Sequence, residues 1–180
     1  MTYESILEAK NFIAGKLNAI PDTAIILGSG LSPLAEKIEK PVVIPYKDIP
    51  HFPVSTVKGH KGNLVAGLLK NKMVLCMQGR FHYYEGYTMQ EVTFPIRVMQ
   101  LLGVKNLIVT NAAGGVNKSF VAGDIMLITD HISRMPNPLV GANDDRLGER
   151  FPSMSSVYDK NLIQKAKTIA ENNGIIVKEG

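Results

Sequence analysis

Apolar residues near the start of the chain recur at every third or fourth position, which is the spacing of an amphipathic helix. Their positions are Ile6, Ala9, Ile13 and Leu17. Ser5 and Glu8 have the spacing of a capping box, so the helix is expected to begin there. Pro21 closes it, because proline disrupts the interior of a helix.

Two further helices are predicted from the residues at their ends. Thr88 and Glu91 form a second capping-box pattern, and Gly103 ends the helix that they open. Pro95 lies inside this stretch, which predicts a kink or a later start. The other helix covers about residues 159–172 and stops at an Asn-Gly pair.

Short apolar runs bounded by turn residues predict a series of strands. They cover residues 23–27, 42–45, 54–57, 63–69, 73–77, 106–110 and 125–129, with a last candidate in the terminal GIIVKEG. Residues 130–158 are rich in Pro, Asn, Asp and Gly, which predicts a long irregular segment of the kind that is usually functional. Because strands alternate with helices, the sequence predicts an α/β fold with a mixed central β-sheet flanked by helices, in a single domain over residues 1–180.

Composition and charge narrow the class of protein. The chain has 180 residues, of which 45% are hydrophobic and 20% charged, as in ordinary globular domains. The net charge is +4 with scattered basic residues, so we expect no nucleic-acid partner. Cys76 stands in an apolar run, which predicts a buried thiol, and no metal-ligand spacing occurs. The N-terminus is charged and no run approaches the roughly 18 apolar residues of a membrane span, so we expect a cytoplasmic protein with no membrane partner.

Three polar, glycine-rich stretches each follow an apolar strand. They are GSGLS after AIIL, GRFHYYEGY after MVLCM, and NAAGG after LIVT. Parallel neighbouring strands bring such stretches to one edge of a sheet, where the sites of α/β folds gather. Residues 28–30 have the pattern of an anion nest before a helix in which Ser32 is the N-cap and Pro33 comes first, and residues 111–115 can present main-chain amides. Taken alone, the first is equally a tight turn and the second equally a close strand-to-helix crossing.

The stretch RFHYYE places unusual chemistry at one of these strand ends. If the backbone stays extended, Arg80, His82 and Tyr84 share one face. The other face then carries Phe81, Tyr83 and Glu85. A guanidinium fork, an imidazole and a phenol on one face suit an oxyanion beside a polyol. His60, in the turn GHKG, is either solvated or reaches back across the sheet.

Eight blocks of the sequence resemble trimeric purine nucleoside phosphorylases, in that family's order along the whole chain. They are ILGSGL, STVKGHKGNLVAG, MQGRFHYYEGY, VTFPIRVM, VTNAAGGVN, GDIMLITDHI, NPLVGAND and RFPSMSSVYD. The resemblance implies a nucleoside phosphorylase-like fold. It also implies phosphorolysis of 6-oxopurine ribo- or deoxyribonucleosides, giving a free base and a pentose 1-phosphate. The partners are then a purine nucleoside and inorganic phosphate as co-substrate, with no cofactor and no metal.

The resemblance also implies roles for individual residues. The implied phosphate contacts are Ser29, His60, Arg80, His82 and the main-chain amide of Ala112. Tyr84 would bind the ribose, and His82 would also lie near its 5′-hydroxyl. Phe151 would cover the ribose of a neighbouring subunit, which implies a homotrimer. Arg80, His82 and Glu85 are the expected catalytic residues, with Glu85 orienting His82.

The sequence departs from the family's pattern in three places. Ser32 and Ala142 stand where the family usually has glycine and proline. The family's chain continues beyond the matched part, and its purine-binding residues lie there. We therefore expect a domain truncated at its C-terminus that is inactive by itself, and its base specificity is not predicted.

The sequence leaves three alternative functions open. A phosphorylase of 5′-methylthioadenosine is the nearest, although the GHKGN and RFHYYEGY blocks favour the purine nucleoside branch. A non-catalytic protein that keeps only the phosphate and ribose half-site is a second. An α/β oxidoreductase is weakened because the third glycine and the acidic residue of a dinucleotide fingerprint are missing.

Overall fold

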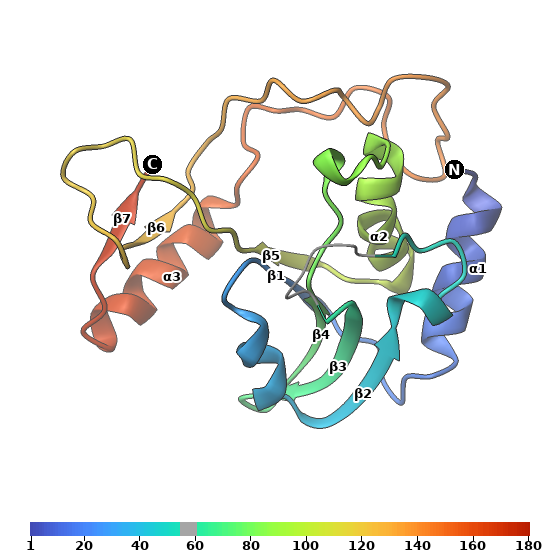
Figure 1. Ribbon diagram of the computed structural model, residues 1–180, viewed down its shortest axis with the longest axis horizontal. Helices are drawn as coiled ribbons and strands as arrows, with labels where there is room; N and C mark the ends of the chain where they lie inside the picture. The colour runs from blue at the N-terminus through green and yellow to red at the C-terminus, as the bar shows by residue number, and fades with distance from the viewer. Residues whose placement is uncertain (55–60) are drawn as a thin grey trace. The chain divides into compact units, whose positions relative to one another are not determined.

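A five-stranded mixed sheet organises the first of two units of the chain (Figure 1). The computed structural model describes residues 1–54 and 61–180, and the first unit comprises residues 1–112 and 137–147. Its strands, in spatial order, are β2 (Glu39–Pro45), β3 (Asn63–Leu69), β4 (Lys72–Gln78), β1 (Thr23–Leu27) and β5 (Asn106–Val109). The first three form an antiparallel meander, whereas β1 is parallel to both β4 and β5. The mixed α/β fold predicted from the sequence is confirmed.

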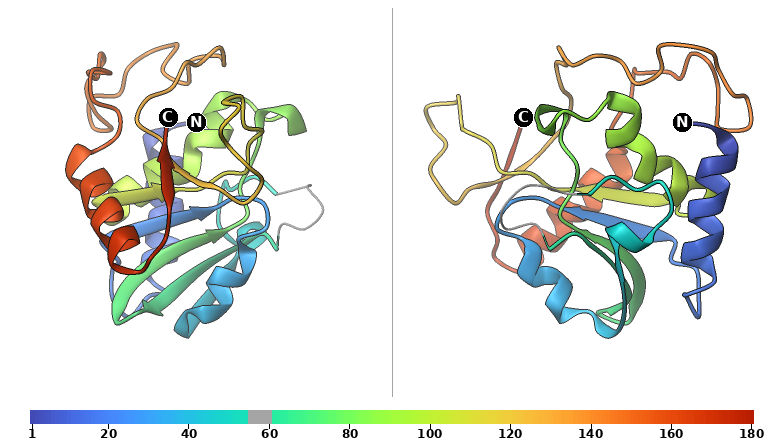
Figure 2. Two further views of the ribbon diagram at one scale, coloured as in Figure 1. Left: turned by 90° about the vertical axis from the view of Figure 1, so that its left-hand side faces the viewer. Right: turned by 45° about the vertical axis from the view of Figure 1, so that its right-hand side comes forward.

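The two faces of this sheet are covered by different elements (Figure 2). Ala24 and Ile26 of β1 pack with α1 (Tyr3–Ala14) and α2 (Met89–Leu102). Ile25 and Leu27, which alternate with them, pack with the short 3₁₀ helix η1 (Ser32–Lys37). Burying each of the three larger side chains, Ile25, Ile26 and Leu27, contributes about 1.5–3 kcal/mol, so the position of β1 in the sheet is strongly specified.

The helix ends follow local rules, with four corrections to the sequence predictions. α1 ends at Ala14 with Gly15 as its C-cap, so Pro21 does not close it. The capping box of α1 is formed by Thr2 and Ser5, not by Ser5 and Glu8, so the helix begins earlier than expected. Ser32 is not an N-cap, because η1 is a 3₁₀ helix whose cap, Leu31, makes no side-chain hydrogen bond. The box of Thr88 with Glu91 is confirmed, and it fixes the start of α2 six residues before Pro95, so the alternative of a later start is wrong.

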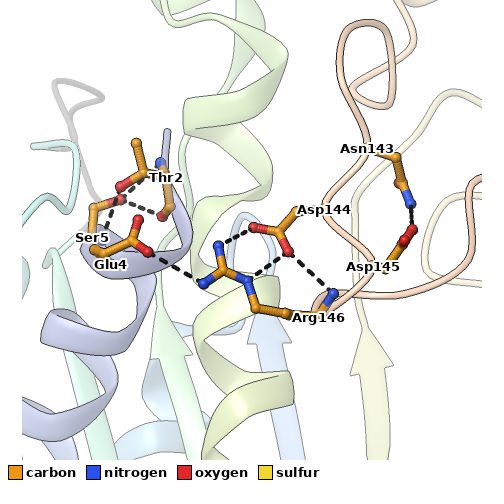
Figure 3. A network of polar contacts seen from close by, with 7 residues as sticks. All are labelled: Thr2, Glu4, Ser5, Asn143, Asp144, Asp145 and Arg146. Atoms are coloured by element: carbon orange, nitrogen blue, oxygen red, sulfur yellow. Dashed lines mark hydrogen bonds and ion pairs between the residues drawn. The ribbon is translucent and has the colours of Figure 1, made fainter.

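Residues 130–158, all of which the structure describes, contain no helix or strand, as predicted. One part of this segment, residues 137–147, belongs to the first unit. Hydrogen bonds of Arg146 connect it to α1 (Figure 3). Arg146 Nε and Nη2 lie 2.8 and 2.6 Å from the two carboxylate oxygens of Asp144, and Nη1 lies 3.3 Å from Glu4 Oε1. The hydrogen bonds that Arg146 donates to Asp144 lower the pKa of the Asp144 carboxyl. At the end of the segment, Gln100 donates a 3.0 Å hydrogen bond to the carbonyl of Leu147.

The second unit comprises residues 113–136 and 148–180. It contains the parallel pair β6 (Ile125–Leu127) and β7 (Val177–Glu179) and the helix α3 (Lys160–Asn172). Asp159 caps α3, since its carboxylate accepts the main-chain N–H groups of Asn161 and Leu162. These elements were predicted, and the prediction of a single domain over residues 1–180 stays a prediction. The strand predicted over residues 54–57 lies, apart from Val54, outside the described residues.

Candidate active site

The carboxyl ends of three strands meet at one edge of the sheet. β1 lies between β4 and β5 and runs parallel to both, as Figure 1 shows. The polar stretches that begin at Gly28, Gly79 and Thr110 therefore leave the sheet side by side. This arrangement confirms the prediction that the three glycine-rich stretches share an edge, where α/β proteins bind ligands.

Gly28 and Thr110 join the first and third strand ends. The N–H of Gly28 donates a 2.9 Å hydrogen bond to Thr110 Oγ1, which in turn donates to the carbonyl of Ile26 at 2.9 Å. A β-carbon at position 28 would lie only 2.6 Å from the carbonyl oxygen of Thr110. Glycine is required here because the two main chains approach so closely.

Arg80 joins the second and third strand ends. Its Nη1 donates a 2.7 Å hydrogen bond to the Thr110 carbonyl, and its Nε donates to His82 Nε2 at 3.3 Å. The preceding residue, Gly79, has a positive φ of 100°, and its carbonyl accepts a 2.7 Å hydrogen bond from the buried hydroxyl of Tyr46. The turn that carries Arg80 is thus fixed by a buried hydrogen bond, and the guanidinium is held through its Nε and Nη1 atoms.

Glu85 holds His82 from the other side. One carboxylate oxygen accepts hydrogen bonds from the His82 main-chain N–H at 2.9 Å and from ring atom Nδ1 at 2.7 Å. The Glu85 side chain is 2% exposed and that of His82 17%. The imidazole also stacks on Tyr84, with ring centroids 4.7 Å apart. The ring of His82 is therefore fixed in orientation between a carboxylate, a guanidinium and a phenol ring.

The expected division of RFHYYE into two faces is correct in part. Arg80 does contact His82, and His82 contacts Tyr84. Phe81 is buried in the core. Glu85, however, lies against His82 rather than on the Phe81 side. The reason is that the chain turns into the 3₁₀ helix η3 (Tyr83–Glu85), which ends the two-residue alternation of an extended strand.

The other predicted site residues fall into three groups. Ser29 and Ala112 are exposed and follow Gly28 and Thr110 closely in the chain, at the same sheet edge. Phe151 is 84% exposed and belongs to the second unit. His60 lies outside the described residues.

Thr110 is the site residue that sequence reasoning missed. It ends the apolar run NLIVT and there resembles an ordinary β-branched strand residue. The available signal was its place, since it is the polar residue at the carboxyl end of an otherwise apolar strand. Cys76, in contrast, is buried as predicted, and burial raises the pKa of its thiol to about 11. A thiol with that pKa is not a nucleophile at neutral pH.

These groups can bind an anion and orient a neutral polar ligand. A guanidinium and main-chain N–H groups from neighbouring strand ends suit a phosphate. Among the described residues, no group of three or more His, Cys, Asp or Glu side chains is arranged to hold a metal ion. Within the same part of the chain, no helix has the length and apolar character needed to cross a membrane.

Comparison with known proteins gives one consistent result. Residues 22–180 match the family described as the Phosphorylase superfamily. Purine nucleoside phosphorylase 1 of Geobacillus stearothermophilus is 56% identical, over 100% of this chain and 66% of the relative. The purine nucleoside phosphorylase of Rattus norvegicus is 51% identical, over 92% of this chain and 58% of the relative.

Solved structures agree with the sequence relatives. Isoform 2 of the Schistosoma mansoni purine nucleoside phosphorylase, in complex with cytosine and ribose-1-phosphate, has a TM-score of 0.93 and 48% identity, covering 99% of this chain and 65% of that one. A schistosoma purine nucleoside phosphorylase in complex with hypoxanthine has a TM-score of 0.93 and 43% identity, with the same coverage. The chain thus spans two thirds or less of the length of these relatives. With 159 consecutive residues matched to the family, a shared fold and this level of identity, the chain belongs to the Phosphorylase superfamily, in its purine nucleoside phosphorylase family.

Proposed function

We propose that this protein is a purine nucleoside phosphorylase, which converts a 6-oxopurine ribo- or deoxyribonucleoside and phosphate into the free base and a pentose 1-phosphate. The observation that carries the proposal is the placement of Arg80. Its guanidinium is fixed between the Thr110 carbonyl and His82, at the sheet edge where the Gly28 turn begins. A held cation beside main-chain amides is what a bound phosphate dianion requires.

In the proposed reaction, phosphate is both the ligand and the nucleophile. Ser29, Arg80, the Ala112 amide and His60 donate hydrogen bonds to it. His82 takes part in phosphate binding through Arg80, because its Nε2 accepts the Arg80 Nε–H. A phosphate oxygen forms a bond to the anomeric carbon as the bond from that carbon to the purine nitrogen breaks. The purine leaves with the electron pair and takes up a proton. Binding phosphate next to the sugar converts a bimolecular encounter into a local step, and its negative charge stabilises the oxocarbenium-like sugar.

The residues beside the phosphate site have supporting roles in the proposal. Tyr84, whose ring stacks on His82, binds the ribose. Glu85 accepts the Nδ1 hydrogen bond and so orients His82. Phe151 covers the ribose of a neighbouring subunit in a homotrimer, consistent with its high exposure. No metal or cofactor takes part, and the cytoplasm remains the predicted location.

The test is an assay of inosine cleavage by the complete polypeptide that carries this sequence. We expect hypoxanthine release only when phosphate is present, with one ribose 1-phosphate formed for each hypoxanthine. Release of free ribose at the same rate without phosphate would show a hydrolase and contradict the proposal. Faster cleavage of 5′-methylthioadenosine than of inosine would favour the related phosphorylase instead.

A further inference from the structure

We propose that Thr110 is a positioning residue that sets the distance between the two halves of the phosphate site. Its hydroxyl fixes the Gly28 turn and its carbonyl fixes Arg80. The inference rests on the proposed function, because it assumes that these two halves hold one phosphate. Thr110 itself does not contact the phosphate.

The Thr110 hydroxyl makes its hydrogen bonds just beyond the end of the ladder between β1 and β5. The ladder between β1 and β5 ends at Ile26 and Val109. Beyond it, the Thr110 N–H still donates to the Ile26 carbonyl at 3.0 Å, and the hydroxyl donates to the same carbonyl at 2.9 Å. With its proton used in this way, Thr110 Oγ1 accepts the N–H of Gly28. Gly28 is buried, and a buried N–H without a partner is destabilising. One side chain thereby fixes the direction in which the chain leaves β1 toward Ser29.

The main-chain carbonyl of Thr110 holds the guanidinium of Arg80. A distance of 2.7 Å to Arg80 Nη1 is that of a charge-assisted hydrogen bond. The same oxygen would lie 2.6 Å from a β-carbon at Gly28, so Gly28 and the guanidinium both approach the Thr110 carbonyl. Loss of the hydroxyl therefore releases the Gly28 turn while Arg80 keeps its carbonyl partner, so the two halves of the site are no longer held at one spacing. A phosphate that contacts both gains affinity from having them held in advance.

Four substitutions separate positioning from bulk stability. Thr110→Val keeps the branched shape but removes the hydroxyl, whereas Thr110→Ser keeps the hydroxyl. Thr93→Val is a matched control, because the Thr93 hydroxyl bonds to carbonyls of its own helix, Met89 at 2.8 Å and Gln90 at 3.4 Å. Thr110→Ala is a second variant without the hydroxyl, for use if Thr110→Val does not fold.

The measurements are the phosphate dissociation constant, the two KM values and the hydrogen exchange rate of the Gly28 amide, all on the complete polypeptide. For Thr110→Val we expect phosphate binding to weaken about tenfold, the loss expected when a contact to a charged group is misplaced. The phosphate KM should rise in parallel, the inosine KM should change little, and the Gly28 amide should exchange faster. Thr110→Ser should recover most of the phosphate affinity, and Thr93→Val should bind phosphate like the wild type.

The outcomes distinguish this proposal from the proposed function. Wild-type-like phosphate affinity in Thr110→Val would overturn the positioning role, as would an equal rise of both KM values. If the wild-type protein binds no phosphate, the proposed function fails. In that case the Gly28 amide alone decides the structural part: unchanged exchange in Thr110→Val overturns it and faster exchange supports it.

Discussion

One carboxylate oxygen of Glu85 accepts two hydrogen bonds from His82, from the main-chain N–H at 2.9 Å and from Nδ1 at 2.7 Å. Because the Arg80 Nε–H can only donate, His82 Nε2 is the acceptor of this pair, and Nδ1 is the ring nitrogen that donates to Glu85. The Glu85 side chain is 2% exposed, and a buried carboxylate is stable only when it is well hydrogen-bonded. The pair thus fixes the tautomer of His82 and the start of η3 together.

Two substitutions of Glu85 should separate these roles. Glu85→Ala leaves both His82 donors without their partner and should lower the free energy of unfolding by about 1–3 kcal/mol, measured by urea denaturation. Glu85→Gln keeps an acceptor oxygen, so it should lose less stability while kcat still falls, because the negative charge beside the imidazole is gone. An alanine variant as stable as the wild type would contradict the structural role of this pair.

Replacing Arg80 should raise the KM for phosphate more than the KM for the nucleoside. The planar guanidinium of Arg80 matches the geometry of an oxyanion. Because hydrogen bonds to charged groups contribute strongly to binding free energy, Arg80→Ala should raise the phosphate KM by about ten- to a hundredfold. The inosine KM should change far less. Arg97→Ala, which removes an arginine of α2 that is not among the site residues, is the control and should leave both values near those of the wild type. Equal increases of both KM values in Arg80→Ala would rule out its assignment to phosphate.

Phe151 is expected to act on the site of a neighbouring subunit. Chains carrying Arg80→Ala and chains carrying Phe151→Ala should each have low activity, but mixing them and letting them reassemble should restore part of it. Some mixed trimers then contain a site with both residues intact. If mass spectrometry confirms mixed trimers and no activity returns, Phe151 serves its own subunit.

Cys76 should react only when the protein unfolds. Burial raises the pKa of its thiol from 9.0 to about 11, so the folded protein holds it neutral and shielded at pH 8. Alkylation by iodoacetamide should therefore follow the rate of unfolding. Since the folded pKa is the higher one, the stability that this thiol contributes is complete below pH 9 and decreases as the pH rises toward 11. Labelling of the native protein as fast as a free thiol would contradict this.

The sequence predicts the sheet edge well because the signals for it are local. Each of the three strand ends shows an apolar run that changes abruptly to glycine and polar residues, and parallel pairing then brings them together. The start of α2 is also local, since Thr88 and Glu91 make the predicted capping box. The start of α1 was misplaced because two overlapping pairs have the same three-residue spacing, and Thr2 with Ser5 prevails over Ser5 with Glu8.

What the sequence did not predict depends on contacts between distant positions. Thr110 bonds to Gly28, 82 residues away, and no local pattern distinguishes that hydroxyl from one on any strand. Glu85 was placed on the wrong side because the alternation rule assumes an extended chain, whereas η3 begins directly after His82. Local rules thus identify which residues carry the chemistry, and tertiary contacts decide how they face one another.

If three strand ends build one phosphate site, titration of inorganic phosphate onto the complete polypeptide should reveal that site. We expect saturable binding of one phosphate per chain, measured by isothermal calorimetry. Ribose 1-phosphate should compete with it, because its phosphate group would occupy the same place. Absence of saturable binding, or phosphate binding that ribose 1-phosphate leaves unchanged, would show that the three strand ends do not form this site.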